Sequence, residues 1–199
     1  NNQNVNLGGS HKVAFLRALE KKDDAVAILH GDDQATSDEL LVLIEQLKIH
    51  PEAAAILGAR FLPKSRLRGY AKTRIFGNKV FNLIFSFITL RKTVDLGSGL
   101  NIFRMHHLAD KRFLCFRDTL TFNVDLLLDY YRKKSPLEYV AITWSEDDQI
   151  SNARNFKIAR MIFTQLLRWR FGIRERDYKA LQPQESDYAS REIFHINIQ

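Results

Sequence analysis

Residues 25–47, AVAILHGDDQATSDELLVLIEQL, lead from an apolar run through a polar segment into a helical pattern. Residues 25–29 are continuously apolar and have the length of a strand, which predicts a buried strand. Ser37 or Asp38 can cap a helix, because a side-chain oxygen there accepts hydrogen bonds from amides of the first turn. The apolar residues that follow recur with helical spacing as far as Leu47. The sequence therefore predicts a strand, a polar turn and a helix in direct succession.

The alternation of strand and helix patterns continues along the chain. Apolar runs of strand length alternate with longer amphipathic stretches, and this order predicts an α/β domain with helices packed on a mostly parallel sheet. Residues 1–10 and 61–69 are predicted to be loops. Further helices are expected at 11–20, 73–90, 123–134 and 153–171, and further strands at 53–59, within 95–104 and at 137–143.

The composition limits the number of domains and the kinds of partner that we expect. A chain of 199 residues with 45% hydrophobic content can form one domain with a core, which we expect at residues 1–172, followed by a charged extension at 173–199. Thirty Lys and Arg against 23 Asp and Glu give a net charge of +7, which favours anionic partners. The single cysteine, Cys115, excludes an internal disulfide and fits a reducing compartment. The most apolar window, residues 75–90, is shorter than the roughly 20 residues of a spanning helix.

The polar segment after the first predicted strand holds a candidate metal site. In α/β sheets ligands bind beyond the carboxyl ends of strands, which is where His30, Asp32 and Asp33 fall. Two carboxylates and an imidazole suit Mg²⁺ or Mn²⁺ that bridges to phosphate oxygens. The alternative is that the two aspartates only form a solvated turn and a helix cap, since Asp and Gly are ordinary turn residues.

Four stretches, one of which contains the candidate metal site, occur in an order that resembles a known family. They are residues 6–12 (NLGGSHK), 25–34 (AVAILHGDDQ), 58–61 (GARF) and 95–104 (DLGSGLNIFR). The set resembles glycosyltransferase family 2 with the GT-A fold, in the branch of dolichol-phosphate mannosyltransferase and related polyprenyl-phosphate sugar transferases. The stretches are similar, in turn, to the family's Asn-x-Gly segment, its Asp-x-Asp strand end, its Gly-Ser-Arg and its Asp-x-x-Ser-Gly-Phe-Arg-x-Phe-x-Arg element. Residues 78–90 stand where the family has an Asn-x-x-x-Asn helix.

The chain departs from the family pattern in two places. The family's opening strands, with a Pro-x-Tyr-Asn stretch and an Asp that binds the nucleotide base, have no counterpart. We therefore expect a GT-A-like (Rossmann-like) sheet that is partial at its amino end. The first Asp of the family's metal motif aligns with His30, so that the chain has His-Gly-Asp. Asp32 is then the carboxylate best placed to bind metal.

The resemblance implies an inverting, metal-dependent transfer of a sugar from a nucleoside-diphosphate sugar to a lipid-phosphate or glycan acceptor. A Mg²⁺ or Mn²⁺ ion held by Asp32, with His30 and Asp33, would stabilise the charge on the departing diphosphate. An acceptor hydroxyl needs a general base. Asp125 stands where the family often has an acidic residue, and Asp95 is a second acid near the acceptor. A phosphate acceptor is already anionic and needs no base.

Three basic residues are candidates for binding the donor phosphates: Lys12, Arg60 and Arg104. Guanidinium groups meet phosphate oxygens in bidentate geometry, which favours the two arginines. Each arginine can instead form an ordinary ion pair. In particular, Arg104 can pair with Asp95 as part of the scaffold.

Residues 66–90 and 153–171 bear on the partner and the location. Both place Lys and Arg beside wide apolar faces, which is typical of helices at a membrane interface and also of helices that cover a sheet. We expect a cytoplasmic protein, with peripheral contact to the cytoplasmic face of a membrane as an alternative to core packing. A catalytically inactive glycosyltransferase-like scaffold is a second possible function. A basic nucleic-acid-binding domain is a third, and the helical spacing of the aromatic residues disfavours it.

Overall fold

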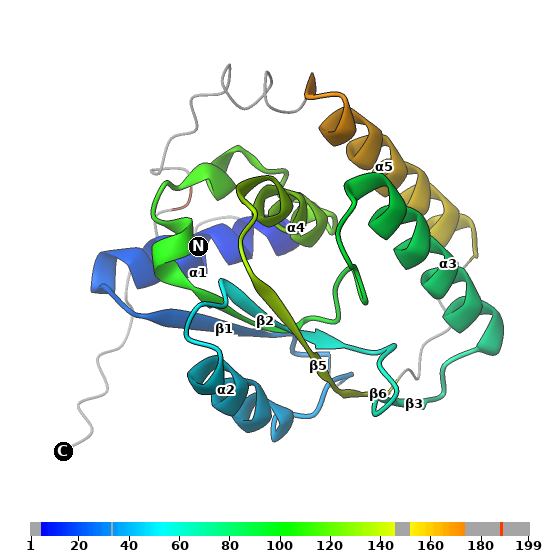
Figure 1. Cartoon of the computed structure of the whole chain (residues 1–199), viewed down its shortest axis with the longest axis horizontal. Coiled ribbons are helices and arrows are strands. Elements are labelled where there is room, and N and C mark those ends of the chain that lie inside the picture. The colour runs from blue at the N-terminus through cyan, green and yellow to red at the C-terminus, as the bar shows by residue number, and fades with distance from the viewer. Residues whose placement is uncertain (1–4, 33, 146–151, 174–187, 189–199) are drawn as a thin grey trace.

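The structure is a computed structural model that describes residues 5–32, 34–145, 152–173 and 188. Within these residues it confirms the α/β class, because a four-stranded sheet is covered by helices (Figure 1). Most of the expected extension at 173–199 lies outside the described residues. The domain boundary at residue 172 therefore stays a prediction.

The main sheet is mixed. It consists of β1 (Ala25–Leu29), β4 (Leu100–Arg104), β2 (Ala55–Ala59) and β5 (Leu137–Ala141), in that spatial order. β2 and β5 are parallel, whereas β4 runs antiparallel to both of its neighbours. Two of the three strand pairings are thus antiparallel, and the predicted mostly parallel sheet is not confirmed. The sequence pattern carried no information on strand direction.

The strand predicted as buried at 25–29 forms as β1, but it is only half-buried. Among the described strands β1 pairs with β4 alone, so it lies at an edge of the sheet. The expectation of burial was wrong because an apolar run does not reveal how many neighbours its strand has. The predicted strand at 53–59 is observed as the central strand β2 and is largely buried.

A second, two-stranded sheet pairs β3 (Arg66–Arg68) with β6 (Thr143–Ser145) in parallel. The prediction that residues 61–69 form only a loop was wrong for these three residues. Their partner strand lies far along the chain, and only the tertiary fold brings the two together. Trp144 of β6 also forms an isolated antiparallel bridge with Ala35, which ties the segment after β1 to this second sheet.

The helices are α1 (Asn6–Lys21), α2 (Glu39–Ile49), α3 (Lys72–Thr89), α4 (Phe122–Lys133) and α5 (Asn152–Arg170). Each predicted helix is confirmed, but α1 begins five residues before the expected start. Gly8 explains the difference, because its amide donates to the Asp118 carbonyl at 3.0 Å. A Cβ at Gly8 would lie 2.6 Å from the Arg117 carbonyl oxygen, so only glycine lets the helix approach this loop.

The helices cover the two faces of the sheet. α2 packs on one face through Leu43, against Ile56 and Ile102. α1 and α4 pack on the other, where Phe15 meets Phe103. α3 and α5 lie beside α4 and share a third apolar cluster with it (Figure 1). None of the helices in the described part of the chain combines the length and the apolar character needed to cross a membrane.

Candidate functional site

The direction of β4 brings three chain segments to one edge of the main sheet, at the ends of its strands. Because β4 runs against its neighbours, its amino end lies beside the carboxyl ends of β1 and β2. Leu29 pairs with Leu100, and the His30 amide donates to the Gly99 carbonyl at 3.1 Å. This end of the sheet therefore brings together His30, Arg60 and the loop 95–99. We call these residues the strand-end site.

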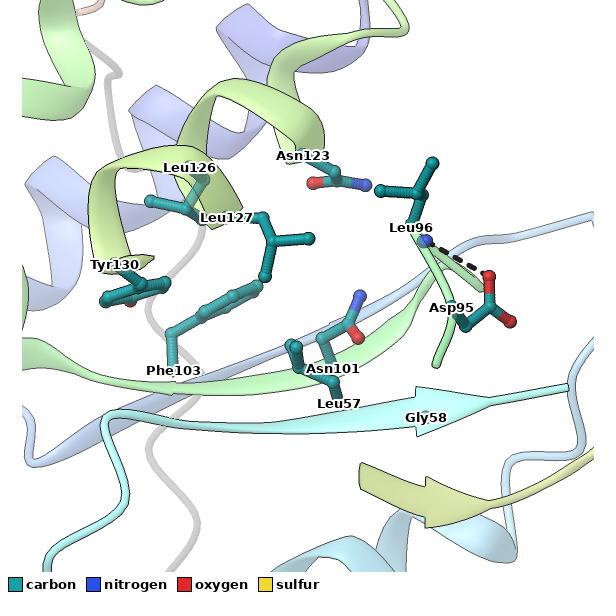
Figure 2. A pocket seen from close by; sticks show the side chains of 11 residues that line it. Leu57, Gly58, Asp95, Leu96, Asn101, Phe103, Asn123, Leu126, Leu127 and Tyr130 are labelled. Carbon is teal, nitrogen blue, oxygen red and sulfur yellow. Dashed lines mark hydrogen bonds between the residues drawn. The ribbon is translucent and has the colours of Figure 1, made fainter. Parts of the chain in front are cut away.

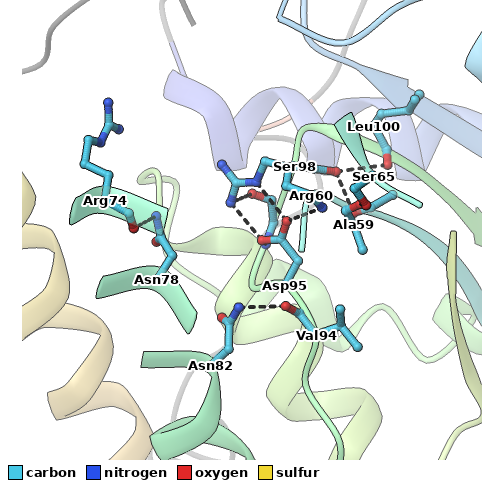
Figure 3. A network of polar contacts seen from close by, with 12 residues as sticks. Ala59, Arg60, Ser65, Arg74, Asn78, Asn82, Val94, Asp95, Ser98 and Leu100 are labelled. Atoms are coloured by element: carbon cyan, nitrogen blue, oxygen red, sulfur yellow. Dashed lines mark hydrogen bonds and ion pairs between the residues drawn. The ribbon is translucent and has the colours of Figure 1, made fainter. Parts of the chain in front are cut away.

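Arg60 and Asp95 form the centre of the strand-end site (Figure 3). The Arg60 Nε and Nη2 atoms donate to the two Asp95 carboxylate oxygens at 2.8 and 2.7 Å. The Arg60 amide donates to the same carboxylate at 2.9 Å. The side chains are 14% and 1% exposed, so this is a buried bidentate ion pair. The guanidinium also lies over the rings of Phe61 and Trp144, at 5.2 and 5.0 Å from their centres.

The loop that carries Asp95 is held in place from both sides. The Ser98 hydroxyl donates to the Gly58 carbonyl at 2.7 Å, which fixes the loop to β2. From α3, the side-chain Nδ2 atom of Asn82 donates to the Val94 carbonyl at 2.6 Å (Figure 3). Gly58 has no room for a side chain, since a Cβ would meet the Leu100 carbonyl oxygen at 2.6 Å. These contacts give Asp95 a fixed position before any ligand binds.

A small pocket opens beside the Arg60–Asp95 pair, between β2, β4 and α4 (Figure 2). Its volume is about 20 Å³, which is room for water and far below the several hundred Å³ of a typical ligand pocket. Asp95, Asn101 and Asn123 are among the polar residues that line it. The Asn123 side-chain oxygen is buried and has no hydrogen-bond partner among the described residues. The pocket is too small to enclose a ligand of the size of a sugar nucleotide.

The ring of His30 lies between the loop 95–99 and α1. A Cβ on Gly99 would lie 2.5 Å from the His30 Nδ1 atom, and the ring stands edge-on to His11 with 6.2 Å between the centres. The Nε2 atoms of both histidines are buried without a partner among the described residues. Burial lowers the pKa of His11 below its ordinary value of 6.5, and the neighbouring His30 lowers it further, while a hydrogen bond to the Leu7 carbonyl opposes both.

Asp32 lies at the rim of the strand-end site and is exposed. One of its oxygens accepts a hydrogen bond from the Gln34 amide at 3.3 Å, which is the geometry of a local turn. It does not line the pocket. Asp33, the second predicted carboxylate, lies outside the described residues. Within the described ranges no group of three or more His, Cys, Asp or Glu side chains is placed to hold a metal ion.

Lys12, a predicted phosphate ligand, is buried away from this edge. Its ammonium donates to the carbonyls of Leu114 and Phe116 at 3.0 and 2.6 Å. It also lies 2.7 Å from an Asp118 carboxylate oxygen and 3.0 Å from the Tyr188 hydroxyl. With these partners Lys12 holds the segment before α4 against α1.

Arg104 lies at the opposite end of β4, five residues from the strand-end site. Its guanidinium donates to the carbonyls of Leu47 and Ala53, at 2.6 and 3.1 Å, and so caps the end of α2. The alternative pairing of Arg104 with Asp95 was wrong, because Arg60 takes that place. The residue spacing alone could not decide which arginine lay nearer.

Asp125, the predicted general base, is fully buried near the amino end of α4. Its carboxylate accepts a hydrogen bond from the Gln165 side chain of α5 at 2.7 Å. The Arg117 amide contributes a longer contact of 3.4 Å. Asp125 does not line the pocket. The structure thus brings together His30, Arg60 and Asp95, and it places Lys12, Arg104 and Asp125 elsewhere.

Sequence reasoning missed three polar residues of this region: His11, Asn101 and Asn123. Asn101 faces the pocket from β4, where the neighbouring positions Leu100 and Ile102 face α2. A polar residue inside an otherwise apolar strand is the signal that could have identified it. The other two carry no comparable signal, since each lies in an ordinary amphipathic helix.

Comparison with known proteins adds no assignment to this geometry. No model of a known protein family matches the chain, and no curated protein matches it either.

Proposed function

We propose that the protein is a GT-A-like, inverting glycosyltransferase that moves a sugar from a nucleoside-diphosphate sugar to a lipid-phosphate acceptor. The observation that carries the proposal is the convergence of His30, Arg60 and Asp95 at one edge of the sheet. These residues come from three of the stretches that resemble glycosyltransferase family 2. Nothing in their spacing along the chain requires them to meet.

The direction of the strands supports the placement of a donor there. In α/β sheets ligands bind beyond the carboxyl ends of the strands, and β1, β2 and β5 all end at this edge. Asp95 fixes the Arg60 guanidinium, which in the proposal faces the donor diphosphate. Preorganised cations of this kind stabilise charge without a reorganisation cost during the reaction.

Asp32 and His30 are the residues that would hold a divalent cation. A Mg²⁺ or Mn²⁺ ion bound there would act as a Lewis acid toward the leaving diphosphate. The Nε2 atom of His30 is buried and has no hydrogen-bond partner among the residues that the structure describes, which fits a role as ligand. Asp32 is exposed and keeps its carboxylate at the surface, where a donor phosphate can share the ion.

The environments of the two acids predicted from the sequence, Asp95 and Asp125, favour a phosphate acceptor over a hydroxyl acceptor. Both Asp95 oxygens are bound by Arg60, and Asp125 is fully buried against Gln165. Neither carboxylate is presented as a general base. A lipid phosphate is already ionised at neutral pH and attacks without one, with inversion at the anomeric carbon.

A catalytically inactive scaffold is the second candidate, and two observations favour it. The Asp32 carboxylate makes a turn contact with Gln34, and the pocket beside Asp95 is only about 20 Å³. In such a scaffold the Arg60–Asp95 pair would serve the fold alone. Sugar transfer separates the two candidates, since an inert scaffold would show none.

Thermal unfolding with Mn²⁺ and a nucleoside diphosphate tests the proposal. UDP and GDP are each added with Mn²⁺, and a ligand at about 100 times its Kd is expected to add about 2.7 kcal/mol, or roughly 5–10 °C in Tm. Asp32→Ala should abolish the shift. Asp23→Ala is the matched control, because Asp23 is an exposed acid at the other end of β1. The absence of any shift, or a shift that Asp32→Ala leaves intact, would overturn the proposal.

A further inference from the structure

The outer face of α3 carries an apolar stripe that runs from Phe76 to Leu90. Phe76, Leu83, Phe87 and the capping Leu90 are 70–79% exposed, and Val80 and Ile84 are about half as exposed. Their spacing of three and four residues places them on one stripe of the helix. A soluble surface helix ordinarily has polar residues on the side that faces away from the core.

The same helix buries a different face. Asn82, Phe85 and Thr89 point inward, and Phe85 packs with Leu128 of α4 and Leu166 of α5. The exposed stripe therefore lies opposite the core, and no part of the described fold covers it. A helix that packs on the core with one face and exposes a long apolar stripe on the other is typical of a docking surface.

The charge of α3 and of its neighbour α5 favours an anionic partner. α3 contains three Lys and Arg and α5 contains five, and neither helix contains an acid. The remaining 22 basic residues are matched by 23 acids, so these two helices account for the whole positive charge of the chain. α3 and α5 lie side by side at one end of the molecule (Figure 1).

We propose that the outer surfaces of α3 and α5 dock the protein on an anionic lipid membrane. Phe76, Leu83 and Phe87 would enter the boundary between headgroups and acyl chains. Lys72 and Lys79, which are exposed beside the stripe, meet the lipid phosphates. On α5, Phe163 and Arg168 are likewise exposed and extend the surface. This docking does not depend on transferase activity, because it uses none of the residues at the strand-end site.

Docking would also bring the strand-end site near the lipid surface. α3 contacts the loop before β4 on its inner side, where Asn82 binds the Val94 carbonyl next to Asp95. The loop and the membrane-facing stripe are thus opposite sides of one helix. A lipid-phosphate acceptor held in the membrane would therefore have to pass α3 to reach the site.

Co-sedimentation of the full chain with vesicles tests the docking. Vesicles of phosphatidylcholine alone are compared with vesicles that contain phosphatidylserine, with no nucleotide present. We expect binding to the anionic vesicles that weakens as salt is raised. The triple variant Phe76→Ser/Leu83→Ser/Phe87→Ser should lower the partition by at least about tenfold, and Lys72→Glu/Lys79→Glu by a similar factor.

Leu41→Ser/Val42→Ser/Ile49→Ser on α2 is the matched control, since these three residues are also exposed and apolar. This control should bind vesicles like the unchanged protein, and circular dichroism should show that all variants fold. Binding that survives the α3 variants, or no binding to anionic vesicles, would overturn the proposal. Analytical ultracentrifugation that shows a dimer dependent on Phe76 and Phe87 would also overturn it. So would a protein that binds oligonucleotides but does not bind the anionic vesicles.

Discussion

Arg60 and Asp95 form a buried two-point ion pair that joins the end of β2 to the loop before β4, 35 residues later along the chain. The pair has two consequences. It fixes the orientation of the guanidinium at the strand-end site, and it neutralises a carboxylate that has almost no contact with solvent. A buried charge is tolerated only when it is paired and hydrogen-bonded, so each partner depends on the other.

Removal of one partner of this pair should destabilise the fold strongly. Asp95→Ala leaves the Arg60 guanidinium largely buried without its carboxylate, and we expect a loss of about 3–5 kcal/mol in the free energy of unfolding by urea. Glu20→Ala is the control, because it breaks the exposed Arg17–Glu20 pair on α1. That pair should contribute about 0–1 kcal/mol. Equal losses in the two variants would contradict a buried, structural role for Asp95.

Lys12→Met separates a structural role from a role in phosphate binding. The substitution keeps the apolar stem but removes the ammonium from the Leu114 and Phe116 carbonyls, so we expect a loss of about 3 kcal/mol in unfolding free energy. The Kd for Mn²⁺ and a nucleoside diphosphate, measured by calorimetry below the unfolding temperature, should not change. If the free energy of unfolding were unchanged and the Kd rose about tenfold, Lys12 would instead be a residue that binds the phosphates.

Gly99 holds the loop in a conformation that other residues rarely adopt. Its φ is +78°, and an added Cβ would lie 2.5 Å from the His30 ring. Gly99→Ala should therefore cost about 2–3 kcal/mol in unfolding free energy and displace His30. Gly31→Ala is the matched control, because a Cβ at Gly31 meets nothing within 4 Å. Losses of similar size at both positions would argue against the close contact with His30.

The burial of His11 predicts a pH dependence of stability. The pKa of His11 is lowered in the folded state, so the unfolded chain binds the proton more tightly. Stability should be complete well above pH 6.5 and should fall as the pH drops below 6.5, by at most about 1.4 kcal/mol per pH unit for one proton. Urea unfolding between pH 7.5 and pH 5 measures the slope.

His11→Gln should flatten this slope, because the variant has no group at this position that titrates in the range. His107 is the comparison, since burial also lowers its pKa but its ring is only half-buried. His107→Gln should remove a smaller part of the slope. A slope that His11→Gln leaves unchanged would place the acid sensitivity elsewhere in the chain.

The sequence by itself determined the local elements. Hydrophobic periodicity depends on neighbours within a few residues, and it correctly predicted β2 and each helix from α2 to α5. It also predicted that His30 and Arg60 end apolar strands, and this places them at the carboxyl ends of β1 and β2. The order of these segments was enough for the α/β class.

Only the tertiary structure decided which distant residues are partners. The antiparallel direction of β4, the pairing of β3 with β6, and the choice of Arg60 over Arg104 for Asp95 all join segments far apart in the chain. The burial of Lys12 and the exposure of the α3 stripe are decided in the same way. A side chain's identity limits the contacts it can make, but the packing of the whole chain decides which contacts form, because burial depends on neighbours that no local pattern contains.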